Sequence, residues 1–558
     1  MRSLPVAALV FALAAPVPGA AADLDALGRI RDEGLRSSEV MEIAEHLTDA
    51  IGPRLTGSPQ MRVANEWTRD QFSEWGLADA RLEPYEFGEG WSFTRSEMRM
   101  LAPVAAELFA LPKAWTPGTD GVVRGEAMKV KLESAEDVEK LAGKISGKIL
   151  FVAEPRERRD PEKPMFVRRT PAELDELVEY DIPGARDREA WRERRRKMRE
   201  VWKKANELFA AEGVLATVDV SSFDHGAVRL GGAGTNGIPG ELEGVPALVL
   251  GAEQYARIYR LLEEKTPVEL EIQVDATYHR DDPNAWNTLA ELPGGSLRDE
   301  IVMAGAHLDS WHPGTGATDN AAGSAVVMEA ARILKSLGRT PRRTIRFALW
   351  SGEEQGLLGS SAYVEQHLAT RPESTDPEQL ELPARWRQKG WPIHPIQPAY
   401  GKFYAYFNLD NGGGRVRGIY AQENLGAKAL FERWMAPLAD LGVTAVTMEN
   451  TSSTDHVPFD RVGLPGFQFV QDSRDYSTRT HHSHLDTYDY LQREDLMQAA
   501  VVMASTLWQA ANEDGPFPRK PMPEEPKAER EKRERRERGE AEEAKGEASG
   551  ASTASAAR

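Results

Sequence analysis

Apolar runs and amphipathic stretches alternate along the second half of the chain, from residue 287 to about residue 511. Continuous apolar runs predict strands over residues 301–306, 344–350, 403–409 and 466–470. Positions at helical spacing lie between them; one predicted helix places Val327 and Leu334 on the same face and ends at Gly338. This alternation predicts an α/β fold with a mostly parallel sheet and helices on both faces.

The first half of the chain has a different pattern. Residues 23 to about 101 are mainly helical, with a strand over 80–87. Between residues 112 and 277, short predicted strands and a long charged helix over 191–211 carry no cluster of metal-ligand side chains. We therefore expect one α/β domain made of residues 23–111 and 278–514, interrupted by an inserted domain over residues 112–277.

Neither end of the chain has the pattern of a folded domain. Residues 1–22 combine a basic start at Arg2, a short apolar run and small residues at 19–22, which predicts a secretory signal peptide and not a membrane anchor. Residues 515–558 are rich in Pro, Glu, Lys and Arg and then in small residues, which predicts a disordered charged tail. We expect a protein exported to the periplasm or the medium.

The composition limits which partners the protein can bind and which residues can hold a metal. The formal net charge of −19 over 558 residues argues against a nucleic-acid partner, and no later segment is apolar enough to suggest a membrane. The chain has no cysteine, so a metal site would use only His, Asp and Glu side chains. The sequence leaves a homodimer open.

Ligand-type side chains follow three of the predicted strands directly. His307 and Asp309 come after the first strand, Glu353 and Glu354 after the second, and Asp410 after the third. Each motif alone is commonly structural or surface charge. Because ligands bind beyond the carboxyl ends of the strands in an open parallel sheet, we expect these side chains to converge on one site.

Two further stretches complete a candidate metal site. Asp319 begins the next helix after the glycine-rich loop 313–316, and a late run adds His481, His482 and His484. Two metal ions about 3.5–4 Å apart need a bridging carboxylate and more N or O ligands on each side. Hydrolysis also needs a carboxylate that is free to take a proton from water, so adjacent glutamates can divide these tasks.

These motifs resemble the co-catalytic di-zinc exopeptidases of metallopeptidase family twenty-eight, and within it the carboxypeptidase Q (plasma glutamate carboxypeptidase) branch. The resemblance spans residues 38 to 511 and rests on residues 52–58, 307–311, 317–320, 349–356, 408–410 and 481–487. It implies the zinc exopeptidase fold, an inserted region like a protease-associated domain, and two Zn²⁺ per chain. It also implies that the substrate is a short peptide.

The resemblance assigns the metal ligands. His307 and Asp410 would bind the first zinc, Glu354 and His482 the second, and Asp319 would bridge the two. The choice of His482 over His484 rests on the spacing to the later Asp486.

The resemblance also assigns roles in the reaction. Glu353 would be the general base that deprotonates a water between the two zincs. Asp309 would accept the second ring N–H of His307 and so orient the ring. His481, where many related aminopeptidases have Tyr, would stabilise the oxyanion.

The expected activity is hydrolysis of a peptide bond at a chain end, as a dipeptidase or carboxypeptidase. An aminopeptidase of the same family is the alternative, followed by a glutaminyl-cyclase-like zinc acyltransferase and a non-catalytic binding protein. Which end of the peptide is cut depends on the group that recognises the substrate. An aminopeptidase needs an acidic group that binds the substrate's free amine, and a carboxypeptidase needs a cation that binds its carboxylate. Arg474 and Arg479, near the late histidines, are candidate cations.

Overall fold

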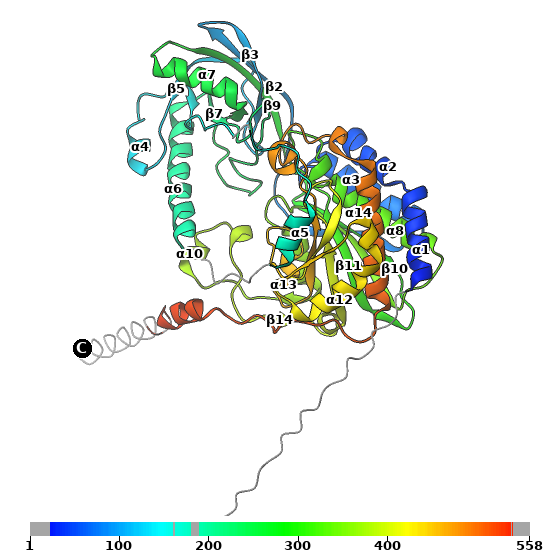
Figure 1. The fold of residues 1–558 in the computed structure, drawn as a ribbon. Helices are drawn as coiled ribbons and strands as arrows, with labels where there is room; N and C mark the ends of the chain where they lie inside the picture. Colours follow the sequence, from blue (N-terminus) through cyan, green and yellow to red (C-terminus); the bar gives the residue numbers. More distant parts are fainter. Residues whose placement is uncertain (1–22, 160–161, 180–188, 537, 539–558) are drawn as a thin grey trace, which may run out of the picture.

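The computed structural model describes residues 23–159, 162–179, 189–536 and 538. The predicted signal peptide and most of the tail beyond residue 536 lie outside the described residues. Within the described part, two eight-stranded sheets organise the chain, and Figure 1 shows them as two bodies side by side. The second half of the chain builds most of the first sheet.

The first sheet is parallel at its centre, as the alternation of strands and helices predicts. β11 lies between β12 and β15, and β18 follows β15, all in parallel pairs. The edges add antiparallel pairs between β10 and β12 and between β16 and β18. The strands in spatial order are β1 (Ala78–Glu86), β10 (Asn284–Leu292), β12 (Arg343–Trp350), β11 (Leu297–His307), β15 (Phe403–Asn408), β18 (Gly466–Gln471), β16 (Val416–Tyr420) and β17 (Ala445–Thr447).

Helices cover this sheet on both faces, which confirms the predicted α/β class. Among the described residues, none of the helices is both long and apolar enough to cross a bilayer. The α-helices are α1 (Leu24–Arg36), α2 (Val40–Glu45), α3 (Pro59–Glu74), α8 (Ala322–Ser336), α9 (Leu358–His367), α10 (Pro377–Leu380), α11 (Ala399–Lys402), α12 (Leu425–Met435), α13 (Val457–Asp460) and α14 (Arg493–Asn512). Short π- and 3₁₀-helices are η1 (His46–Ile51), η2 (Ala317–Ala321), η3 (Ala384–Trp386), η4 (Ala436–Leu441), η5 (Tyr476–Thr480) and η6 (Tyr488–Tyr490).

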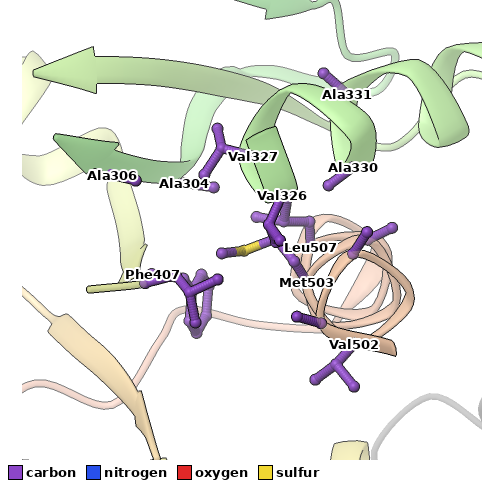
Figure 2. Packing of buried hydrophobic residues seen from close by; sticks show 14 of the residues in the cluster. Ala304, Ala306, Val326, Val327, Ala330, Ala331, Phe407, Val502, Met503 and Leu507 are labelled. Atoms are coloured by element: carbon purple, nitrogen blue, oxygen red, sulfur yellow. The ribbon is translucent and has the colours of Figure 1, made fainter. Parts of the chain in front are cut away.

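The main core lies between the central strands and the pair α8 and α14. Figure 2 shows Val326 of α8 close to Met503 and Leu507 of α14, beside Ala304 of β11. All four side chains are buried. Burial of this kind stabilises at roughly 25 cal/mol per Å² of apolar surface, so the core fixes β11 and with it the strand end that carries the site.

The second sheet lies within the stretch between β1 and β10. Its spatial order is β3 (Ala106–Leu108), β2 (Gly90–Ala102), β9 (Glu269–His279), β5 (Val123–Lys129), β6 (Ile149–Phe151), β7 (Ala216–Val220), β8 (Ala247–Leu250) and β4 (Ala110–Pro112). Three helices accompany it: α4 (Ala135–Glu139), α6 (Glu189–Glu212) and α7 (Ala252–Glu263); α5 (Pro171–Val178) instead contacts β17 of the first sheet.

The second sheet begins earlier than the predicted boundary at residue 112. β2 pairs with β9 along its whole length, from Gly90 opposite His279 to Ala102 opposite Glu269. An alternating strand pattern shows that a strand forms but not which sheet it joins. Residues 90–112 therefore belong to the second sheet, and its last strand ends at His279.

The first part of the predicted disordered tail packs against the first sheet. Phe517 is buried, with its ring 5.3 Å from Tyr404 and 6.0 Å from Phe431 between centroids. Arg519 donates a hydrogen bond of 2.9 Å to the carbonyl of Tyr400. Phe517 and Arg519 thus contact the first sheet's domain, within the segment for which the sequence predicted a disordered tail.

We predict that Phe517→Ala destabilises the protein by about 3–5 kcal/mol, because it leaves a cavity among aromatic rings. The shift of the urea unfolding midpoint measures the effect. Met522→Ala is the matched control, since Met522 lies in the same segment and is 43% exposed. Equal midpoints for both variants would contradict the anchoring role of Phe517.

Candidate metal centre and active site

The predicted site residues meet at the carboxyl edge of the first sheet. His307 is the last residue of β11 and lies opposite Trp350, the last residue of β12. Glu353 and Glu354 follow β12 in the next turn, and Asp410 follows β15. The parallel pairing of these three strands brings their ends together, as the sequence predicted.

Asp319 lies between two pairs of side chains. Its Oδ1 is 3.3 Å from His307 Nε2, which is also 3.3 Å from Asp410 Oδ1. Its Oδ2 is 3.2 Å from His482 Nε2, which is 2.9 Å from Glu354 Oε2. The two oxygens of one carboxylate thus face two separate His–carboxylate pairs.

These residues fit bound divalent cations. Asp319 Oδ2 and Glu354 Oε1 are buried and have no hydrogen-bond partner among the described residues. Ligand atoms of His307, Asp319 and Glu354 lie within 4.8 Å of one another, and so do those of His307, Glu353 and Asp410. Buried carboxylate oxygens need a cation or a donor, and an N and O donor set suits zinc.

Protons occupy this cluster when no cation does. Burial alone would lower the pKa of His482, but the charge of Glu354 and the close contacts with the carboxylates of Asp319 and Glu354 raise that pKa to about 10. Burial and the charge of Asp319 raise the pKa of Glu354 to about 7. Cation binding must therefore displace protons from the same atoms.

Within the described part of the chain, the Glu353 carboxylate forms no hydrogen bond or ion pair, unlike the other carboxylates of the cluster. Burial raises the pKa of Glu353 well above its usual range, against the charge of His307 and with the charges of Asp410 and Asp455. Asp455, which sequence reasoning missed, is fully buried, and burial raises its pKa to about 8. A carboxyl group whose pKa is raised in this way holds a proton more readily than an exposed one, as a general base requires.

Asp309 orients His307, but through its main chain. His307 Nδ1 donates to the Asp309 carbonyl at 2.9 Å, whereas the Asp309 carboxylate is 3.6 Å away. That carboxylate instead accepts from Thr56 Oγ1 at 3.0 Å and from the backbone N–H groups of Glu353 and Glu354, both at 3.3 Å. The Asp309 carboxylate thus lies within ion-pair distance of His307, as expected, but its hydrogen bonds go to Thr56 and to the two glutamates.

Asp486 positions Asp319 through hydrogen bonds to Thr318 and to the Asp319 backbone, a role that sequence reasoning missed. Its Oδ1 accepts from the N–H and hydroxyl of Thr318, both at 2.7 Å, and its Oδ2 accepts from the Asp319 N–H at 3.1 Å. Burial and the charge of Asp319 raise the pKa of Asp486 to about 7. The four-residue spacing from His482 to Asp486 was the available signal.

Of the two late histidines considered as metal ligands, His482 lies in the cluster and His484 does not. His484 Nδ1 accepts from the Val228 N–H at 3.1 Å, away from the cluster. His481 Nε2 lies 3.8 Å from Asp319 Oδ2, and burial lowers the pKa of His481 to about 4, so its ring is neutral. His481 therefore borders the cluster without a charge of its own.

The candidate cations Arg474 and Arg479 contact the segment around residue 166. The Arg474 guanidinium lies 5.4 Å from the centre of the Phe166 ring, and Arg479 Nη2 is 3.6 Å from Met165 Sδ. Neither contact involves a residue of the cluster.

Arg54 joins the loops beneath the site. It is fully buried and donates hydrogen bonds of 2.7–3.0 Å to five carbonyls, those of Leu47, Gly52, Leu308, Thr315 and Gly316. Burial lowers its pKa to about 10, against the charges of nearby aspartates, and the guanidinium keeps its charge at neutral pH.

Carboxylates and imidazoles gathered at the carboxyl edge of parallel strands, with one acid left unpaired, define a metal-dependent hydrolase. Residues 287–507 match the sequence model of Peptidase family M28, and the chain carries a domain of that family. The family resemblance seen in the motifs is thereby confirmed, and the protein is a metallopeptidase.

Curated relatives cover nearly the whole chain. Carboxypeptidase Q of Mus musculus is 25% identical over 477 residues, which are 85% of this chain and 86% of that protein. Carboxypeptidase Q of Homo sapiens is 24% identical, with 85% of each chain covered. Leupeptin-inactivating enzyme 1 of Streptomyces exfoliatus is 30% identical over 34% of this chain and 36% of its own.

Solved structures share the fold. A peptidase M28 precursor from Shewanella amazonensis SB2B superimposes with a TM-score of 0.63 at 24% identity, over 90% of this chain and 99% of its own. BSAP, a zinc aminopeptidase from Bacillus subtilis, gives 0.52 at 17% identity, over 85% and 94%. These likenesses confirm the zinc exopeptidase fold.

We predict that Asp486→Asn lowers the affinity for zinc by about 10- to 100-fold, because an amide has one oxygen where the carboxylate accepts with two. Elemental analysis after dialysis against a graded chelator series measures retention. Asp489→Asn, an exposed residue of the same stretch, is the control. Unchanged retention in Asp486→Asn would rule out its support of Asp319.

Proposed function

We propose that the chain is an exported exopeptidase that holds two zinc ions and hydrolyses short peptides, dipeptides foremost, in the manner of a carboxypeptidase. The position of Asp319 between two His–carboxylate pairs carries this proposal. Similarity to carboxypeptidase Q over 85% of the chain supports the substrate class. Export rests on the signal peptide predicted at residues 1–22.

The proposed ligands of each zinc follow from the two His–carboxylate pairs beside Asp319. His307 and Asp410 would hold one zinc and Glu354 and His482 the other, with one oxygen of Asp319 on each. Bound zinc would supply a Lewis acid that polarises the scissile carbonyl. A zinc aminopeptidase among the similar structures supports the choice of metal.

Glu353 moves the proton in this proposal. Its carboxylate takes a proton from the attacking water and returns it to the amine that leaves, so that water is divided between the two products. Asp309 keeps Glu353 in place by accepting from its backbone N–H. His481, whose Nε2 lies 3.8 Å from Asp319 Oδ2, would donate to the oxygen that gains charge during attack.

An aminopeptidase is the second candidate, because a structure of the same fold is described as one. The two directions differ in which end of the substrate the site recognises. A carboxypeptidase tolerates a blocked amine and needs a free carboxylate, and an aminopeptidase requires the reverse.

We predict cleavage of dipeptides and N-blocked peptides, no cleavage of amino-acid amides, and loss of all activity with a chelator until zinc is restored. Chromatography of the products from such a substrate panel, with and without chelator, is the measurement. Cleavage of amides with blocked peptides left intact would establish the aminopeptidase instead. Activity that survives complete zinc removal would contradict the metal-dependent proposal.

Glu353→Gln is expected to lower kcat by about 10²- to 10⁴-fold while the zinc content stays near that of the unchanged protein, because an amide cannot accept the proton. Steady-state kinetics and elemental analysis check the two expectations together. Glu365→Gln on α9 is the control, since Glu365 is an exposed partner of Lys389. Full activity in Glu353→Gln would remove Glu353 from the reaction.

A further inference from the structure

A short segment between β7 and β8 connects the second sheet's domain to the late histidines. The Leu230 N–H donates to the His482 carbonyl at 3.1 Å, and the His484 N–H donates to the Val228 carbonyl at 3.2 Å. Arg229 and Ser483 form an isolated antiparallel bridge between them. Residues 228–230 thus pair with the backbone of the late histidines, at a sequence distance of about 250 residues.

Arg229 projects from this segment onto His481. Its Nε donates to the His481 carbonyl at 3.1 Å, and its Nη2 lies 3.3 Å from His481 Nδ1. A guanidinium has N–H donors and no acceptor, so His481 Nδ1 must be the acceptor in this contact. An imidazole whose Nδ1 accepts carries its N–H on Nε2, which is the atom that lies 3.8 Å from Asp319 Oδ2.

The ring of His481 is fixed on its faces as well as at its edge. Tyr476 packs 4.7 Å from it and His482 3.8 Å from it, both between ring centroids. These contacts limit rotation of the ring, but they do not select a tautomer. The contact of Nδ1 with Arg229 does distinguish the two ring nitrogens, and the carboxylate of Asp319 beside Nε2 agrees with it.

We propose that Arg229 is a positioning residue, which holds His481 as the Nε2–H tautomer so that this N–H donates to the oxygen that gains negative charge as the scissile bond is attacked. This inference rests on the proposed function. It also makes the second domain a part of the active site, since residues 216–250 lie in the second sheet's domain and supply the guanidinium. A lysine cannot replace it, because one ammonium cannot span both the carbonyl and the ring nitrogen in the same fork geometry.

The direct test is nitrogen NMR of the zinc-loaded protein with ¹⁵N-labelled histidine rings, the His481 signals being assigned from their absence in His481→Gln. We expect an unprotonated Nδ1 and a protonated Nε2 in the unchanged protein, and loss of this preference in Arg229→Met. Arg124→Met is the control, because Arg124 is exposed on β5 and pairs with Glu271. A protonated Nδ1 in the unchanged protein would overturn the proposal.

Kinetics test the consequence with a dipeptide substrate. Arg229→Met should lower kcat by about 10- to 100-fold and leave KM within about twofold, as expected when a donor to the transition state is misplaced. In the His481→Gln background the same change should have little further effect, because Arg229 acts through His481. Equal losses in both backgrounds, or full rescue by Arg229→Lys, would overturn the proposal.

Two outcomes distinguish this inference from the proposed function and from direct binding of the substrate by Arg229. If the unchanged protein cleaves no peptide, the proposed function fails, while the NMR result still decides the tautomer. If Arg229→Met raises KM only for substrates with a free carboxylate and leaves the tautomer unchanged, Arg229 binds the substrate directly and the positioning role is overturned. Zinc content and thermal midpoint, measured alongside, detect a variant that has lost its fold.

Discussion

The geometry of the site depends on one buried cation, Arg54. Its guanidinium is out of contact with solvent and is surrounded by backbone carbonyls from the end of η1, from the turn after β11 and from the loop before η2. A buried charge is tolerated only when its donors are satisfied, so these loops must close around it together. Displacing any of them would leave N–H groups of Arg54 unpaired.

The loop before η2 shows how tight that closure is. Gly316 has a φ of +62°, and a Cβ added there would lie 2.3 Å from the Cβ of Ser310. Glycine is the residue that accepts both the left-handed backbone and the close approach. The carbonyl of Gly316 then accepts from Arg54, and the loop delivers Asp319 to the point where both of its oxygens have His neighbours.

Much of this arrangement could be predicted from the sequence, because it follows from local patterns and one topological rule. The apolar run at 344–350 forecast β12 to within one residue, and the rule for parallel strand ends gathered His307, Glu354 and Asp410. Other features could not be predicted, because they are contacts between distant segments that leave no periodic pattern in the sequence. The main-chain acceptor of His307, the pairing of β2 with β9 and the contact of Arg229 with His481 each need the folded backbone before they exist.

Repulsion between the carboxylates of the cluster explains why positive charge lies around it. Asp319, Glu353, Glu354 and Asp410 repel one another in a region where water screens little, so the fold needs positive charge at their centre. Arg54 contributes one charge from below, and protons on His307, His482 and the carboxyl groups with raised pKa values supply the rest when no cation is bound. Divalent cations would replace those protons on the same atoms, so falling pH favours the proton-filled cluster and rising pH the cation-filled one. Glu353 lies within 4.8 Å of ligand atoms of His307 and Asp410 but has no ion-pair partner among the described residues, and under the proposed function its proton passes to the substrate.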